Sequence, residues 1–162
     1  MPKDVVEGKL VLSVHHYNPT EYTLTAKYSQ WGHTADAAKK LPGDNEGEIR
    51  GIFERIYANF ISKGIPVYMG EFGCVNRATP LEQQFQQYYL KYYARLAKIY
   101  GVPCIIWDNG AKGAGNERHA FIDHATGEYA SEEAKAAIEA LIESYNSDMS
   151  LNAVYKSAPE NK

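Results

Sequence analysis

The 162-residue sequence lacks most of the features that assign a chain to a functional class at once. Its net charge of −3 gives no electrostatic argument for binding nucleic acid or a membrane surface, and no apolar run is long enough to cross a membrane. No glycine-rich phosphate loop follows a predicted strand, and the five histidines have no ligand-like spacing with acids or thiols. We therefore expect no nucleic acid, membrane, metal or cofactor partner.

Cysteine is also scarce, and Cys74 and Cys104 are predicted to be free thiols. Cys74 follows Glu71 by three residues and Cys104 precedes Trp107 by three. If Glu71 and Trp107 both end neighbouring strands, the two cysteines are about 15–20 Å apart. A disulfide requires Cα atoms within about 7 Å, so the cysteines say nothing about the redox compartment.

What the sequence does contain is typical of one compact globular domain, with 44% hydrophobic and 23% charged residues. Thirteen tyrosines and two tryptophans are many for this length. An aromatic surplus lines sugar-binding clefts, but it also packs the outside of a barrel, and composition does not separate these readings.

Strand and helix patterns alternate along the chain, which predicts an α/β fold with parallel strands and right-handed crossovers. A capping box with proline at the first helical position opens the helix that begins at Thr79, and Gly101 ends it. The polar tail, residues 148–162, is expected to be loose. The predicted strands cover residues 10–15, 66–72 and 102–107, the helices cover about 46–63, 80–101 and 131–145, and a small hairpin covers 120–130.

Polar and aromatic side chains follow each predicted strand, where a parallel α/β fold keeps its chemistry. They are His15 with Tyr17, Glu71, and Trp107 with Asn109. The loops after Tyr17 and Trp107 are long, about 28 and 23 residues, and loops of this length are usually functional. Taken alone, Glu71 reads equally well as a capping carboxylate and Trp107 as a core residue. Their convergence suits sugar chemistry, because an acid can attack an anomeric carbon and a tryptophan face can stack on a pyranose ring.

At these positions the chain resembles glycoside hydrolase family 5, and within it the bacterial endo-β-1,4-glucanase branch. Residues 14–19, with His-x-Tyr before proline, resemble the sixth strand of the family's (β/α)₈ barrel. Residues 65–73 resemble the seventh strand, residues 105–110 the eighth, and residues 121–128 the segment after it. Trp31, in the first long loop, resembles a substrate-loop feature of the same branch.

The resemblance implies a role for each matching residue. Glu71 is the expected nucleophile, Tyr17 is expected to steady it, and His15 to bind a sugar hydroxyl. Trp107 is expected to floor the −1 subsite. Asn109, Trp31 and Tyr22 are further candidates for substrate binding. The expected substrate is a β-1,4-glucan, and cellulose, xyloglucan, mixed-linkage glucan and mannan are not separated.

The resemblance also implies that much of the barrel is missing, since the fold usually takes about 250 residues. Residues 1–147 are expected to supply only the last three βα units, strands six to eight. The general acid/base glutamate of strand four and the arginine beside the nucleophile belong to the absent part. No motif places a substitute acid. Glu46 and Glu48 belong to a predicted helix start and Glu117 to a glycine-rich loop, and strand alternation points Asp108 away from the cleft.

Three barrel strands leave two edges and an interior face unpaired, which favours association with another chain. Five apolar side chains are expected to need such a partner: Leu12, Val14, Val67, Met69 and Ile105. The partner is either a second copy or a missing N-terminal half. Residues 1–3 suggest a start codon set before an internal boundary, with no signal peptide behind it. Enzymes of this family are typically secreted, but the location of this chain stays open.

Two hypotheses follow. In the first, the chain is the nucleophile-bearing part of a retaining endoglucanase whose acid/base lies in the absent half, so that it is inactive or very weak alone. In the second, it is an inactive, self-associating half-barrel that binds glucan weakly.

Overall fold

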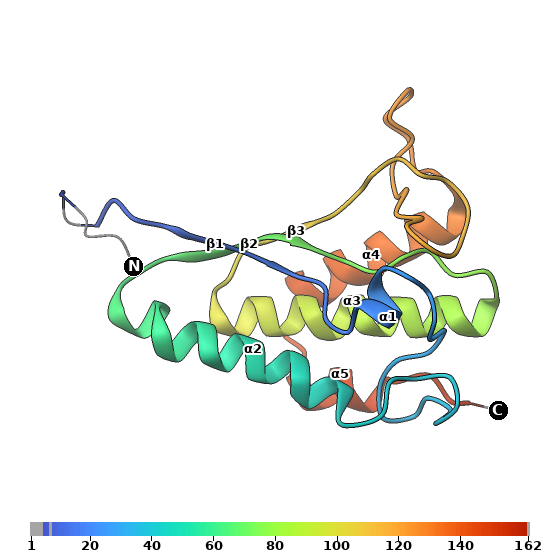
Figure 1. Cartoon of the computed structure of the whole chain (residues 1–162), viewed down its shortest axis with the longest axis horizontal. Helices are drawn as coiled ribbons and strands as arrows, with labels where there is room; N and C mark the ends of the chain where they lie inside the picture. The colour runs from blue at the N-terminus through green and yellow to red at the C-terminus, as the bar shows by residue number, and fades with distance from the viewer. Residues whose placement is uncertain (1–4, 7, 162) are drawn as a thin grey trace.

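The computed structural model describes residues 5, 6 and 8–161, so the predicted boundary at residues 1–3 lies outside the described part. Three parallel strands form one sheet in the order β1-β2-β3 (Figure 1). The strands are β1 Leu12–His16, β2 Val67–Phe72 and β3 Cys104–Ile106. The helices are α1 Thr20–Thr23, α2 Asn45–Asn59, the 3₁₀ turn η1 Ile61–Lys63, α3 Pro80–Tyr100, α4 Glu132–Asn146 and α5 Leu151–Lys156. The predicted alternation and parallel pairing are confirmed.

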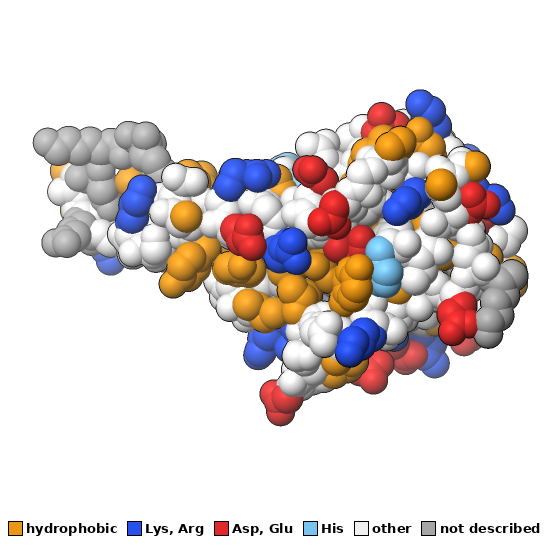
Figure 2. Space-filling model, turned by 90° about the horizontal axis from the view of Figure 1, so that it is seen from below, with side chains coloured by type: hydrophobic (Ala, Val, Ile, Leu, Met, Phe, Trp, Pro, Cys, Tyr) orange, Lys and Arg blue, Asp and Glu red, His pale blue; other side chains and the backbone are white. Residues whose placement is uncertain are grey.

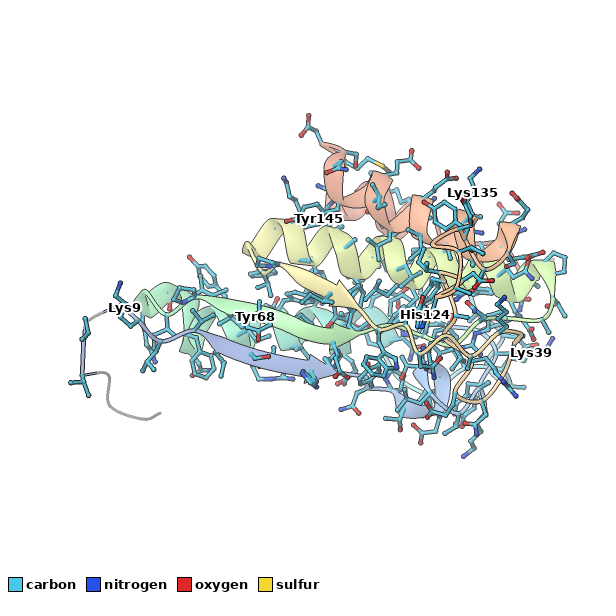
Figure 3. The ribbon with its side chains drawn as sticks, turned by 90° about the horizontal axis from the view of Figure 1, so that it is seen from above. Lys9, Lys39, Tyr68, His124, Lys135 and Tyr145 are labelled. Atoms are coloured by element: carbon cyan, nitrogen blue, oxygen red, sulfur yellow. The ribbon has the colours of Figure 1, made fainter. Side chains whose placement is uncertain are left out.

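The long helices lie on one face of the sheet, while the other face is uncovered (Figures 1 and 3). Val67 and Met69 are buried and Leu12 and Val14 pack against the same core on the helix side. The prediction that these four lack a packing partner was wrong, because strand alternation turns them toward α2 and α3. Ile105 alone of the five is strongly exposed, at 57%. The helix-covered face shows a mixture of charged and hydrophobic side chains (Figure 2).

Helix α3 is the central element of the core and contacts α2, α4 and α5. The predicted capping box is present, with the Thr79 hydroxyl accepting from Glu82 N–H and the Glu82 carboxylate accepting from Thr79 N–H. Gly101 ends the helix in the left-handed conformation, as the sequence predicts. Tyrosines of α3 pack against one another, against Phe72 of the sheet and against the first long loop.

A register shift in β2 lies directly before the carboxyl end of the sheet. Val14 pairs with Met69, but the next residue, His15, pairs with Glu71, so that β2 carries one extra residue. That residue is Gly70, and a Cβ there would lie 2.8 Å from Ser13 Oγ and 3.1 Å from His15 Nε2. The bulge therefore turns Glu71 toward the uncovered face while Phe72 stays buried on the helix side.

The prediction that the C-terminal tail is loose was wrong, because the tail forms helix α5 and packs against the rest of the chain. Ser150 caps α5 by accepting from Ala153 N–H, and Val154 is buried at 1% exposure. The Tyr155 ring stacks on His33 of the first long loop with ring centroids 3.8 Å apart. Burial of Val154 and this stacking fix the tail, which its polar composition does not reveal. Cys74 and Cys104 are free, as predicted.

Candidate active site

The carboxyl ends of β1 and β2 bring Glu71, Tyr17 and His15 together. The Tyr17 hydroxyl donates to Glu71 Oε2 at 3.0 Å, and His15 Nδ1 lies 3.4 Å from Glu71 Oε1. Strand alternation predicts that His15 and Tyr17 share a face and that His16 faces the other way. This is observed, since His16 is buried on the helix side and stacks on Tyr93.

The electrostatics of Tyr17 make it a hydrogen-bond donor at ordinary pH. Partial burial, the hydrogen bond to Glu71 and the charges of Glu71 and Glu117 hold the pKa of Tyr17 well above its ordinary value. Its proton therefore remains on the hydroxyl and points at the Glu71 carboxylate. The Thr23 hydroxyl donates to the Tyr17 carbonyl and ties the residue to the start of the first long loop.

Trp107 follows β3 on the uncovered side of the sheet. Its backbone N–H donates to the Phe72 carbonyl at 2.8 Å, which places it one strand away from Glu71. The Trp107 side chain is 38% exposed and is available as a stacking surface.

Asp108 turns away from the cleft, as alternation predicts, and organises the loop that follows β3. Its carboxylate accepts from the backbone N–H groups of Gly110, Phe121 and Ile122, and His124 Nε2 lies 3.1 Å from it. Burial alone would raise the pKa of Asp108, but these hydrogen bonds and His124 lower it below its ordinary value. A carboxylate held ionised in this way is a poor proton donor, so Asp108 does not suit the missing acid/base role.

Asn109 is exposed, but its amide is engaged by the same loop. Its Oδ1 accepts from Ala111 and His119 N–H, and its Nδ2 donates to the Glu117 carbonyl at 2.9 Å. Substrate binding by Asn109 stays a prediction, and its observed contacts brace the loop. This loop, residues 108–130, rises above the uncovered face of the sheet at its carboxyl end (Figure 1), and His124 marks it in Figure 3.

The structure places Trp31 and Tyr22 in the core, each with 1% exposure. Trp31 packs edge-on to Tyr89 with centroids 5.2 Å apart, and the Arg77 guanidinium lies 4.0 Å over the Tyr22 ring. The prediction that both bind substrate was wrong, because the first long loop folds back onto α3 and buries them.

The substitute acids considered from the sequence lie in different environments. Glu46 is buried at 2% exposure and accepts from the His33 backbone N–H and from Tyr88, with His33 Nδ1 also 2.8 Å away. Glu48 belongs to α2. Glu117 is different, since its side chain is 56% exposed and its charge acts on Tyr17. Among the described residues, no group of three His, Cys, Asp or Glu side chains could hold a metal ion.

Two contributors to the site have no clear signal in the sequence. Arg77 is buried at 5% exposure and donates to the carbonyls of Tyr22 and Tyr28, so it fastens the first loop behind the site. The backbone of Glu117 is held by Asn109, eight residues before it, and by Leu24, which is far away in the sequence and near Tyr17. Neither the charge of Arg77 nor the glycine-rich sequence around Glu117 predicts these contacts with backbone groups.

A parallel α/β sheet with these side chains at its carboxyl edge is typical of barrel enzymes that act on sugars. The family model described as Cellulase (glycosyl hydrolase family 5) matches residues 1–113. The chain therefore belongs to glycoside hydrolase family 5, and the family predicted from the motifs is confirmed.

Relatives and solved structures agree with this family. The chain is 33% identical to Endoglucanase B of Neocallimastix patriciarum over 74% of this chain and 23% of that protein. It is 34% identical to Endoglucanase 1 of Ruminococcus albus over 77% of this chain and 27% of that protein. A native Bacteroidetes-affiliated GH5 cellulase superposes with a TM-score of 0.93 at 37% identity, covering 99% of this chain and 41% of that one. A GH5-4 broad specificity endoglucanase from Bacteroides salanitronis gives a TM-score of 0.84 at 42% identity, covering 91% and 39%.

The coverage values also show how much of each relative this chain matches. The chain spans about a quarter of the length of the curated relatives and about two fifths of the solved structures. Its three-stranded sheet with helices on one face is thus part of the family's α/β barrel. No helix in the described part of the chain is long and apolar enough to cross a membrane.

Proposed function

We propose that this chain supplies the nucleophile half of a retaining β-1,4-glucanase, corresponding to strands six to eight of the barrel. The observation that carries the proposal is the contact of Glu71 with Tyr17 at 3.0 Å and His15 at 3.4 Å, at the carboxyl ends of parallel strands. The acid/base glutamate belongs to a part of the barrel outside this chain, so the chain alone is inactive or very weak.

The proposed chemistry is a double displacement. Glu71 attacks the anomeric carbon, and the glycosidic oxygen leaves with a proton from the acid/base carboxylic acid, giving a glycosyl-enzyme. Water, deprotonated by the same acid/base group, then attacks the anomeric carbon and releases Glu71. Tyr17 orients the Glu71 carboxylate throughout, because its raised pKa keeps the donating proton in place. His15 binds a sugar hydroxyl, and Trp107 stacks on the −1 sugar.

The proposed substrate class is a β-glucan polysaccharide. Relatives at 30% identity and above are named endoglucanases, and the Bacteroides salanitronis enzyme is named a broad specificity endoglucanase. The exposed Trp107 face suits the flat apolar face of a β-linked glucosyl unit. No cofactor takes part in the proposed reaction.

The second candidate is an inactive, self-associating half-barrel that binds glucan weakly. The uncovered sheet face favours this candidate. Val11, Ile105 and Trp107 expose 58%, 57% and 38% of their surface on this face. Exposed apolar side chains beside unpaired strand edges favour pairing with a second copy when the other half is absent.

Complementation separates the two candidates. The chain is co-expressed with the part of the Bacteroides salanitronis endoglucanase that precedes its match to this chain, and release of reducing ends from carboxymethyl-cellulose is measured. We expect no release by the chain alone and release by a 1:1 complex. Glu71→Gln should lower this activity by about 10³-fold or more, because the amide is not a nucleophile.

The matched control is Glu54→Gln on α2, where the side chain is 55% exposed and pairs with Arg50. This variant should leave activity unchanged. A folded 1:1 complex that stays active with Glu71→Gln would overturn the assignment of the nucleophile. A 1:1 complex without activity would favour the non-catalytic candidate.

A further inference from the structure

Glu117 has an unusual backbone conformation for its residue type. Its φ is 55°, in the left-handed region that disfavours side chains other than glycine. Among the described residues only Ala26, with φ 54°, shares this feature without being glycine. Gly113 and Gly115, in the same loop, also have positive φ, so glycine is the residue expected at position 117 as well. A strained residue that is not glycine points to a role for its side chain.

The backbone of Glu117 is held from both sides. Its N–H donates to the Leu24 carbonyl at 2.9 Å, and its carbonyl accepts from Asn109 Nδ2 at 2.9 Å. Leu24 follows the segment that carries Tyr17, and Asn109 lies two residues beyond Trp107. Glu117 is thus anchored between the loops that bear the two ends of the candidate site.

The Glu117 side chain is exposed, and its charge acts on Tyr17. Its charge is one of the causes that raise the pKa of Tyr17. The side chain is 56% exposed, and His119 Nε2 lies 4.0 Å from its Oε2. Burial lowers the pKa of His119 to about 4, with Asp108 opposing and Arg77 assisting, so this imidazole is neutral and does not neutralise the carboxylate.

We propose that Glu117 is a further substrate-binding residue, whose carboxylate accepts hydrogen bonds from hydroxyl groups of the glucosyl unit bound over Trp107. A carboxylate with an open side is well suited to this, since hydrogen bonds to ionised acceptors are about twice as strong as neutral ones. The backbone strain at position 117 is the cost of presenting this carboxylate beside Tyr17. The proposal rests on the proposed function, because it requires glucan in the same cleft.

The test uses the whole chain with cellotetraose as the probe, and binding is followed by ¹H–¹⁵N NMR and by tryptophan fluorescence. Glu117→Gln and Glu117→Gly are compared with two controls. Glu128→Gln removes an exposed charge from the hairpin of the same loop, and Ala26→Gly relieves the other left-handed residue. Both Glu117 variants should weaken cellotetraose binding by about tenfold, the effect of losing a hydrogen bond to a charged group. The controls should bind as the unmodified chain does.

Thermal stability distinguishes a binding role of Glu117 from a structural one. A variant that loses only a structural contact should lose stability, whereas loss of a ligand contact should weaken binding without lowering Tm. Glu117→Gly and Ala26→Gly should each raise Tm by up to about 3 °C, because glycine adopts this φ without strain. Higher Tm together with weaker binding for Glu117→Gly supports the proposal. If the unmodified chain and both Glu117 variants bind cellotetraose equally well, the substrate-binding role of Glu117 is overturned and the proposed function is not affected. If the unmodified chain does not bind cellotetraose, glucan binding by this half of the barrel fails, and the role of Glu117 fails with it, whereas the nucleophile assignment is judged separately by the complementation test.

Discussion

At the scale of single residues, the Tyr17 hydroxyl is the contact on which the proposed chemistry depends most directly. It holds one oxygen of Glu71 at 3.0 Å, while His15 lies near the other. A hydrogen bond to a charged group contributes about 1.5–3 kcal/mol. Tyr17→Phe should therefore lower kcat of the complemented barrel by about 10–100-fold, measured on carboxymethyl-cellulose. An unchanged kcat would show that Tyr17 does not orient the nucleophile.

Two buried histidines should make stability depend on pH. Burial, with the charge of Arg55, lowers the pKa of His16 to about 4, and burial lowers that of His119 to about 4, from an ordinary value of 6.5. Between these values the unfolded chain binds more protons than the folded chain. The free energy of unfolding should therefore fall as pH drops from 6.5 toward 4, by up to about 1.4 kcal/mol per pH unit for each histidine.

Urea unfolding between pH 4.5 and 7 measures this dependence. His16→Leu and His119→Leu should each make the slope shallower, because each variant removes one suppressed protonation. His15→Leu is the matched control, since the His15 side chain is 54% exposed. Equal slopes in all four proteins would mean that the two imidazoles are charged, or solvated, in the folded chain.

At the scale of elements, the bulge in β2 is the feature that aims Glu71. Gly70 provides the space for it, because a Cβ there would press on Ser13 and His15. Gly70→Ala should displace His15 from Glu71 and lower the activity of the complemented barrel by about 10–100-fold, the usual effect of a misplaced catalytic group. Gly51→Ala is the control, since a Cβ there meets only Arg55 at 3.3 Å on the outer part of α2.

The control should gain up to about 1 kcal/mol in the free energy of unfolding, because alanine is the better helix former. Full activity of Gly70→Ala would show that the strand absorbs the methyl group without moving the site.

At the scale of the whole molecule, the uncovered sheet face is the main consequence of carrying only part of a barrel. A complemented barrel encloses this face, whereas the isolated chain exposes Ile105 on the edge strand β3. We expect the isolated chain to self-associate at micromolar concentrations, and Ile105→Lys to shift it toward monomer. Ile99→Lys is a closely matched control, since Ile99 on α3 is 52% exposed but lies away from the open face.

Light scattering of the purified proteins over a range of concentrations measures this shift. A monomer at every concentration in the unmodified chain would show that the open face needs no second copy.

The sequence alone determined the local and periodic features of this protein. Alternation placed His15 and Tyr17 on one face and His16 on the other, and Thr79 with Glu82 marked the start of α3. These features depend on neighbours within a few residues, so the order of side chains is sufficient to predict them. The family motifs likewise lie within short runs at the strand ends.

Only the tertiary structure decided the features that join distant parts of the chain. Trp31 and Tyr22 were expected at the substrate and are in the core, because the first loop packs onto α3. The tail was expected to be loose and forms α5, because Val154 finds an apolar surface. Glu117 is held near the loop that follows Tyr17 by a backbone hydrogen bond to Leu24, far away in the sequence. Burial and long-range hydrogen bonds depend on which surfaces meet, and composition and spacing do not contain that information.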